Sequence, residues 1–269
     1  MEQLRYDTLS LNDLVRFAQT NLGISVGRST ISRVLNEFGM TSYTLPKKPK
    51  LTSAQRKDRV SWCTGHLDWS IDDWSKVIFS DESSFELINR HNKIYIRRYR
   101  HDQHRLEKSQ PRTHKGGGLG MWGCLTNHGV GNLVFYQGSI DSSKYIELLD
   151  SNLSSAFNRF PVSDRTGAIL QQDNAKIHTS KKTLTYMKNK RIKLLSWPAN
   201  SPDINIIENL WSIIDNKLLK YTISNNEQLK EATIRIWNDI SIDTIKKLYS
   251  SIPTRLGRII KLRGYSCDS

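Results

Sequence analysis

The chain has 269 residues, 37% hydrophobic and 25% charged, which is enough for one large folded domain plus a small additional unit. Lysine and arginine number 40 against 26 acidic residues, and the resulting net charge of +14 attracts polyanions, with nucleic acid the first to consider. The sequence has no long apolar run, no signal-peptide core, and only three scattered cysteines. These features exclude a membrane-spanning or disulfide-rich protein and predict a soluble, intracellular one.

Two short helices are predicted near the N-terminus. Apolar residues recur at helical spacing over residues 10–22, with Ser10 or Asn12 as a cap and Gly23 at the end. A second helix opens at Ser29 or Thr30 and ends at Gly39, with an apolar face formed by Ile31, Val34, Leu35 and Phe38. Its outward side chains are those that a recognition helix presents to the DNA major groove: Arg28, Ser29, Thr30, Ser32 and Arg33. The alternative interpretation is a helical hairpin with solvated polar residues.

Residues 43–70 are predicted to form a basic linker. The segment has two prolines, no long apolar period, and a concentration of cations at Lys47, Lys48, Lys50, Arg56, Lys57 and Arg59. It could follow phosphates, act as an import signal, or be a solvated connection. We take Lys47, Lys48 and Lys50 as candidate DNA contacts. The expected organisation is a helix-turn-helix unit over 1–42, the linker over 43–70, and a larger domain over 71–269.

The larger domain is predicted to be α/β, with a mixed sheet flanked by helices. Short β-rich runs at 76–82, 84–89 and 93–98 favour a meander of strands, and further strands are expected at 118–126 and 131–137. Helical and strand patterns then alternate, with helices at 142–160 and 181–191, strands at 168–173 and 193–197, and further helices from about residue 206.

Two patterns suggest other functions but lack the required context. Residues 118–123, GLGMWG, match a dinucleotide-binding glycine pattern, but no strand precedes them and no helix follows, so we expect a loop entering a strand that needs small residues. Four histidines could suggest zinc, but they lack cysteines or a regular spacing, and they fall in or near a loop, 97–115, with seven cations and two acids. These are His91, His101, His104 and His114.

Three carboxylates occupy positions that favour metal binding. Asp81 and Asp173 each end an apolar strand, and Glu208 lies at the start of a helix whose core stripe leaves it at the margin of the buried face. Asp203 or Asn205 could cap that helix. Taken singly, each acid could be a turn former or a response to the helix dipole. Together, in a basic chain, three hard oxygen ligands suit Mg²⁺ and a phosphodiester substrate.

The residues around these acids resemble a known family. FSDESSFEL around Asp81, QQDNAKIHTS around Asp173 and WPANSPDINIIENLW around Glu208 look like the signature blocks of the Tc1/mariner superfamily of DDE transposases, which includes bacterial relatives. Between Asp173 and Glu208 lie 34 residues, the Tc1-type spacing. The resemblance covers nearly the whole chain and implies an RNase H-like core and cut-and-paste DNA transposition.

The resemblance also implies roles for these residues. Asp81, Asp173 and Glu208 would be the catalytic triad and would hold two Mg²⁺ or Mn²⁺ ions, with Asp81 bridging them. Glu82 is left out of the site, because successive strand residues face opposite sides of a sheet. The implied partners are the terminal inverted repeats of a transposon, a target site that is TA in the family, and a second copy of the chain. The implied localisation is nuclear, or cytoplasmic in a bacterium.

Two departures from the family pattern qualify the resemblance. The family carries two helix-turn-helix units where this sequence shows one, so we expect an N-terminal truncation that weakens recognition of the repeats. Ile206 stands where the family has proline, which spares every ligand. The alternatives to an active transposase are a silent or domesticated DNA-binding derivative, and a nuclease of the same fold without strand transfer.

Overall fold

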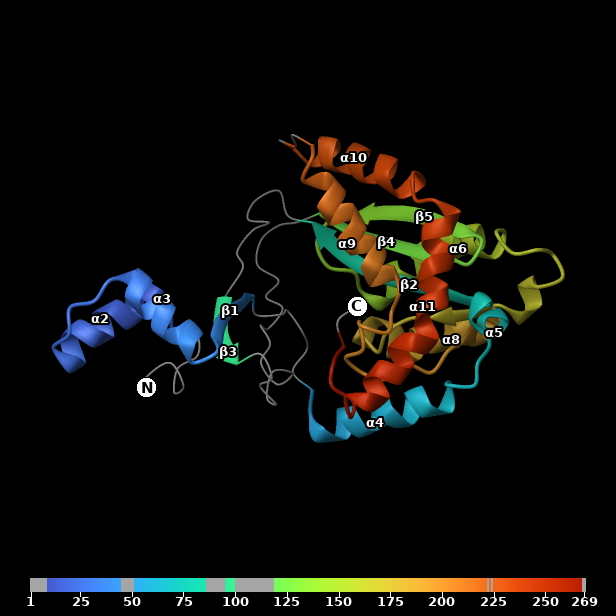
Figure 1. Ribbon diagram of the computed structural model, residues 1–269. Helices are drawn as coiled ribbons and strands as arrows, with labels where there is room; N and C mark the ends of the chain where they lie inside the picture. Colours follow the sequence, from blue (N-terminus) through green and yellow to red (C-terminus); the bar gives the residue numbers. More distant parts are fainter. Residues whose placement is uncertain are drawn as a thin grey trace. The chain divides into compact units, whose positions relative to one another are not determined.

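The computed structural model describes residues 9–44, 51–85, 95–99, 119–221, 223 and 225–267, with only the backbone described at 43–44 and 95–99. The chain divides into two compact units, residues 1–50 with 91–113 and residues 51–90 with 114–269. In Figure 1 the first unit carries the labels α2, α3, β1 and β3, and the second unit carries the others. Among the described residues, no helix is long and apolar enough to cross a bilayer.

The first unit contains the predicted pair of helices, α2 (Leu11–Leu22) and α3 (Arg28–Glu37). Ser10 caps α2 in a reciprocal arrangement with Asp13, and Gly23 ends the helix in the left-handed conformation, φ 67°. The small core of the unit is formed by Leu14, Leu35 and Met40. Helix, turn and helix are therefore arranged as the apolar spacing predicts.

Two details of α3 differ from the prediction. The helix begins at Arg28 with Gly27 as a cap that makes no side-chain hydrogen bond, so neither Ser29 nor Thr30 opens it. Of the expected inward residues, Leu35 is buried, but Val34 is 38% exposed and Phe38 is 52% exposed. In a two-helix hairpin, α2 buries only a narrow stripe of α3. The helical spacing of apolar residues therefore predicts more buried positions than one neighbouring helix can cover.

The expected meander of strands is wrong at its third run. Strand β3 (Tyr95–Tyr99) pairs antiparallel with β1 (Met40–Thr44) in the first unit and not with the strand that precedes it in sequence. The first run and the start of the second form one continuous strand, β2 (Val77–Phe85). Strand propensity identifies these segments but carries no information on which strands pair.

The second unit is built on a mixed five-stranded sheet of order β5-β4-β2-β6-β7. Strand β2 pairs antiparallel with β4 and parallel with β6, so it lies at the centre. The remaining strands are β4 (Leu119–Thr126), β5 (Gly129–Tyr136), β6 (Ile169–Gln171) and β7 (Lys193–Leu194). This confirms the predicted mixed α/β sheet.

Helices cover both faces of this sheet (Figure 1). One face, with Val77 and Phe79 of β2, packs on α9 (Ile207–Leu218), α10 (Asn226–Asn238) and α11 (Ile242–Lys261). The other, with Ile78, packs on α6 (Ser142–Phe157) and α8 (Lys181–Asn189). The other helices of the unit are α4 (Ser53–Gly65), α5 (Ile71–Ser75), α7 (Lys176–Thr179) and the 3₁₀ turn η1 (Arg165–Gly167).

Residues 53–65 do not form the expected linker. They form α4, whose start is fixed by a reciprocal cap between Thr52 and Gln55. Arg59 of α4 is fully buried and makes a bidentate ion pair with Asp203, at 2.8 and 2.6 Å. None of the roles expected for the basic segment included this ion pair, because Asp203 is 144 residues away in the chain. Lys47, Lys48 and Lys50 lie outside the described residues.

The glycine pattern at 118–123 serves packing, as expected. A Cβ at Gly120 would collide with the ring of Tyr136, and one at Gly123 would lie 2.9 Å from the indoles of Trp211 and Trp237. Both glycines lie inside β4 and allow side chains to cross the strand closely.

Candidate active site

Asp81 lies in the middle of β2 and not at a strand end as predicted, because β2 continues to Phe85 while it pairs with β4. The Trp211 Nε1–H of α9 donates to Asp81 Oδ2 at 3.3 Å. Gly123 is the residue opposite Asp81 on β4, and its missing side chain leaves room for this indole. The carboxylate therefore sits under the start of the α9 helix, on the face of the sheet that carries Phe79.

Asp173 follows the end of β6, as the sequence predicts. Asp173 Oδ1 accepts hydrogen bonds from the backbone N–H of Ala175, at 2.8 Å, and from His178 Nδ1, at 2.7 Å. Burial acts to raise the pKa of Asp173, but these hydrogen bonds outweigh burial and hold the pKa below its usual value. Asp173 is therefore ionised and fixed through one of its two oxygens.

Glu208 lies in the first turn of α9, and the core stripe predicted for this helix is confirmed: the buried residues are Ile207, Leu210, Trp211, Ile214 and Leu218. The expected cap by Asp203 is wrong, since that carboxylate pairs with Arg59. Asn205 Oδ1 does accept from the Ile207 N–H at 3.4 Å, although Ile206 occupies the cap position itself. The buried stripe leaves Glu208 half-buried at its margin.

The three acids come together electrostatically. Burial and then the negative charge of Glu208 hold the pKa of Asp81 well above its usual range, and Glu82 and Asp173 add to the effect. Glu208 on α9 and Asp173 after β6 therefore both lie within range of the Asp81 charge on β2. The described residues hold no preformed group of three His, Cys, Asp or Glu side chains arranged around a metal ion. The donor chemistry nevertheless suits one: hard oxygens with an excess of negative charge that a divalent cation neutralises.

His178 is a site residue that sequence reasoning missed. Its side chain is 2% exposed, and its two ring nitrogens face Asp173 Oδ1 at 2.7 Å and Glu82 Oε1 at 3.3 Å. Burial lowers the pKa of His178, but the hydrogen bonds to these acids outweigh burial and raise it to about 10. At neutral pH both ring nitrogens are therefore donors. The available signal was a histidine five residues after Asp173, within the block that was compared with the family.

Glu82 lies on the opposite face of β2 from Asp81, as strand alternation predicts. Its nearest described partner is His178, whereas Asp81 contacts Trp211 on the other face. Glu82 is nevertheless connected to the site, because His178 joins it to Asp173. Leaving Glu82 out of the set of candidate ligands remains consistent with the structure, but it is not an isolated surface acid.

The candidate DNA contacts of the first unit lie on α3. Arg28, Ser29 and Arg33 are exposed, and Thr30 and Ser32 are half-buried. Arg33 makes an exposed ion pair with Glu37 at 2.9 Å. The four histidines first considered for zinc lie outside the described residues.

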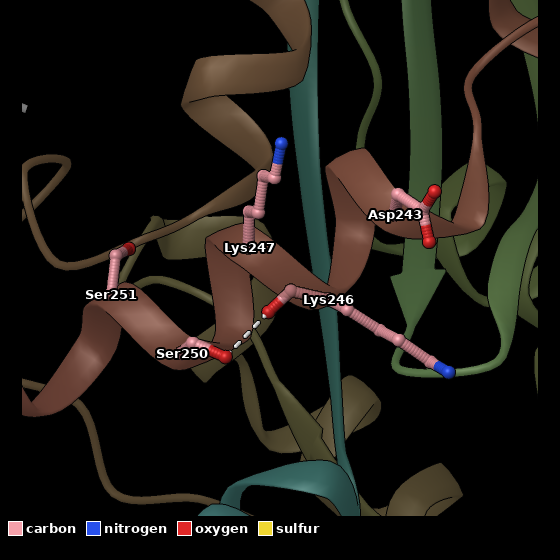
Figure 2. Close-up of a pocket in the computed structure, with 5 residues that line it drawn as sticks. All are labelled: Asp243, Lys246, Lys247, Ser250 and Ser251. Carbon is pink, nitrogen blue, oxygen red and sulfur yellow. Dashed lines mark hydrogen bonds between the residues drawn. The ribbon is translucent and has the colours of Figure 1, made fainter.

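A shallow hollow on α11 is separate from the acids. It is lined by Asp243, Lys246, Lys247, Ser250 and Ser251, and the Ser250 hydroxyl donates to the Lys246 carbonyl at 2.9 Å. Figure 2 shows the side chains of Lys246 and Lys247 pointing away from each other. They do not converge on one ligand, so the hollow is not a candidate for catalysis.

Comparisons with known proteins agree with this geometry. The sequence matches the DDE superfamily endonuclease family over residues 76–230 and a helix-turn-helix family described as transposase over residues 5–68. It is 30% identical to the Tc1 transposase of Caenorhabditis elegans over 241 residues, 89% of this chain and 87% of that protein. It is 32% identical to the Tc3 transposase of the same organism over 257 residues, 93% and 74% of the two chains.

Solved structures show the same fold. The Mos1 mariner paired end complex with Mn has a TM-score of 0.71 at 15% identity, over 98% of this chain and 80% of that one. The catalytic domain of Mos1 mariner transposase has a TM-score of 0.66 at 14% identity, over 82% and 99% of the two chains. The family match and the arrangement of sheet and helices thus define the class as a DDE endonuclease with an RNase H-like core. Within that class, the chain belongs to the Tc1/mariner superfamily of DDE transposases.

Proposed function

We propose that this transposase hydrolyses phosphodiesters at the ends of a transposon and joins the freed 3′-hydroxyl to target DNA. The observation that carries the proposal is the electrostatic effect of Glu208 and Asp173 on the buried carboxyl of Asp81, with the three acids on separate elements of the fold. Acids that only served the fold would not be gathered where their repulsion opposes folding. Such a grouping is typical of a site that a cation completes.

Asp81, Asp173 and Glu208 are the proposed ligands of Mg²⁺ or Mn²⁺, with two ions per site. Asp81 interacts with both other acids, which suits it to a shared position, and Asp173 and Glu208 each complete one side. When bound, the ions supply activation of a water molecule and stabilisation of the leaving 3′ oxygen. Mos1 catalytic domain structures have been solved with Mg and with Mn, each together with Raltegravir.

The two chemical steps need no oxidant and no protein-linked intermediate. In hydrolysis, a water oxygen bonds to phosphorus while the bond from phosphorus to the 3′ oxygen breaks, which leaves a 3′-hydroxyl and a 5′-phosphate. In strand transfer, that 3′-hydroxyl oxygen bonds to a target phosphorus while the corresponding bond in the target breaks. Because both steps are in-line displacements at phosphorus, one arrangement of carboxylates serves both.

DNA recognition is assigned to the first unit. The exposed first turn of α3, with Arg28, Ser29 and Arg33, is proposed to enter the major groove of the terminal inverted repeats. The three lysines at 47, 48 and 50 are proposed to contact phosphates. The target is proposed to be TA, the working form a homodimer, and the site of action the nucleus.

The proposed domain boundaries shift with the structure. The DNA-binding unit, expected over 1–42, is proposed to be the compact unit of residues 1–50 with 91–113, and the catalytic unit is proposed to begin at residue 51 and not at 71. The support is α4, whose Arg59 is buried against Asp203 in the loop before α9.

The catalytic proposal is tested by cleavage of DNA that carries the element's own ends, in Mn²⁺ or Mg²⁺. We expect Asp81→Asn, Asp173→Asn and Glu208→Gln each to abolish nicking while DNA binding in a mobility-shift assay is retained. Asp58→Asn removes an acid from the exposed side of α4 and serves as the matched control. Equal cleavage by the wild type and all three variants would refute the assignment.

The DNA-binding proposal is tested by the salt dependence of affinity. Each lost phosphate contact reduces the slope of log K against log salt by about 0.9. We expect this reduction for Arg28→Ala, and a smaller one for Arg33→Ala because Arg33 must first leave Glu37. Arg16→Ala, which removes an exposed cation from α2, should leave the slope unchanged.

A further inference from the structure

A continuous chain of contacts links Glu82, His178 and Asp173. His178 lies on α7 with its ring enclosed, and the ring of Tyr145 on α6 packs against it with centroids 4.5 Å apart. The Tyr145 hydroxyl in turn donates to Gln172 Oε1 at 2.8 Å. The imidazole is therefore held by packing on its face and by an acid at each ring nitrogen, which leaves it one orientation.

The hydrogen bonds to the Asp173 carboxylate are all on one oxygen, and His178 Nδ1 also lies 3.1 Å from the Asp173 backbone carbonyl oxygen. His178 Nδ1–H and the Ala175 N–H both donate to Oδ1, and among the described residues no hydrogen bond reaches Oδ2. A carboxylate clamped in this way cannot rotate freely about its last side-chain bond. Its second oxygen is then available in one fixed direction, which is the requirement for a metal ligand that must act in a defined geometry.

We propose that His178 and Glu82 are positioning residues for Asp173: Glu82 fixes the ring of His178, and His178 fixes the Asp173 carboxylate so that Oδ2 is left to bind the cation. This inference rests on the proposed function, since it takes Asp173 as a metal ligand. Neither residue is proposed to contact substrate. Outer partners that orient a metal ligand typically change metal affinity 10–100-fold when removed.

The test measures Mn²⁺ binding by the full-length protein from the electron paramagnetic resonance signal of the free ion, alongside the Mn²⁺ concentration for half-maximal DNA cleavage. We expect His178→Ala to weaken Mn²⁺ binding about 10–100-fold. His178→Gln places an amide donor at the same position and should restore part of the affinity. His66→Ala, which removes a half-buried histidine stacked on Trp62 of α4, is the control and should bind Mn²⁺ as the wild type does.

A double-variant cycle tests the order of the chain of contacts. If Glu82 acts through His178, Glu82→Ala weakens Mn²⁺ binding in the wild type but adds nothing in the His178→Ala background. Glu82→Gln keeps an oxygen acceptor for the imidazole N–H and should lie close to the wild type. Additive effects of the two alanine variants would overturn the proposed order, because Glu82 would then act on the metal directly.

The charge of His178 provides the opposing explanation. If His178 acted as a cation that competes with the metal, both His178→Ala and His178→Gln would bind Mn²⁺ more tightly than the wild type, and the positioning role would be refuted. Unchanged affinity in His178→Ala would refute it as well. Failure of the proposed function looks different, since the wild-type protein would then neither bind Mn²⁺ nor cleave DNA.

Discussion

Asp81→Asn should stabilise the metal-free protein while it abolishes cleavage. Asp81 is half-buried, and burial together with the charges of three other acids raises its pKa, so its ionised form opposes folding at neutral pH. Each rise of one unit in the pKa of Asp81 on folding corresponds to about 1.4 kcal/mol of free energy by which the ionised carboxylate destabilises the folded state. Asparagine removes that charge, keeps an oxygen for the Trp211 N–H, and can donate from its amide to a neighbouring carboxylate.

The expected gain is about 1–3 kcal/mol, because the contact with Trp211 and the partial exposure of Asp81 already offset part of the repulsion. For a domain of this size, that gain corresponds to a rise in Tm of roughly 2–12 °C. Divalent metal should reverse the order of stability. At 100 times its Kd, the metal stabilises the wild type by about 2.7 kcal/mol, whereas the variant lacks a ligand and gains less.

The assay is differential scanning calorimetry of both proteins in EDTA and in Mn²⁺, with Asp58→Asn as the control for removing one negative charge. The reasoning predicts a higher Tm for Asp81→Asn in EDTA and a smaller metal-induced shift. A lower Tm than the control in EDTA would show that Asp81 is held by favourable contacts. The inference that a cation completes the site would then lose its physical basis.

Three further outcomes follow from the packing of the second unit. Arg59→Met leaves Asp203 buried without its ion pair and should lower the free energy of unfolding by about 3–5 kcal/mol. This loss corresponds to a fall in Tm of roughly 6–20 °C, whereas the control Lys57→Met, at an exposed neighbouring position, should change Tm little. Gly264→Ala should destabilise by more than about 1 kcal/mol in urea unfolding, because φ is +83° and the new Cβ meets the Arg56 carbonyl, whereas Gly257→Ala in α11 has open space and should stabilise. Burial raises the pKa of the described cysteines, to about 12 for Cys63 and Cys124 and about 11 for Cys267. As the pH rises above 9, the thiols therefore ionise in the unfolded chain before they do in the folded one, and the free energy of unfolding should fall. These thiols should react with Ellman's reagent at pH 8 only after unfolding, and rapid native labelling would contradict their burial.

The sequence by itself determined the local elements and pointed to the three acids that are proposed as the site. Apolar spacing predicts the stripe of α9, the Ser10 cap predicts the start of α2, and the blocks around Asp81, Asp173 and Glu208 carry the family resemblance. These features lie within a few residues of one another in the chain, where side chains on one helix or strand have fixed relative directions.

Only the tertiary structure decided what depends on distant partners. Arg59 looks like a solvated cation until Asp203 is placed against it, and Glu82 looks isolated until His178, 96 residues later, bridges it to Asp173. The pairing of β3 with β1, and the position of Asp81 inside β2, are likewise set by which strands meet. The apolar periodicity of a helix or strand predicts which face a residue occupies. It does not predict what packs against that face, because the opposing side chains come from elsewhere in the chain.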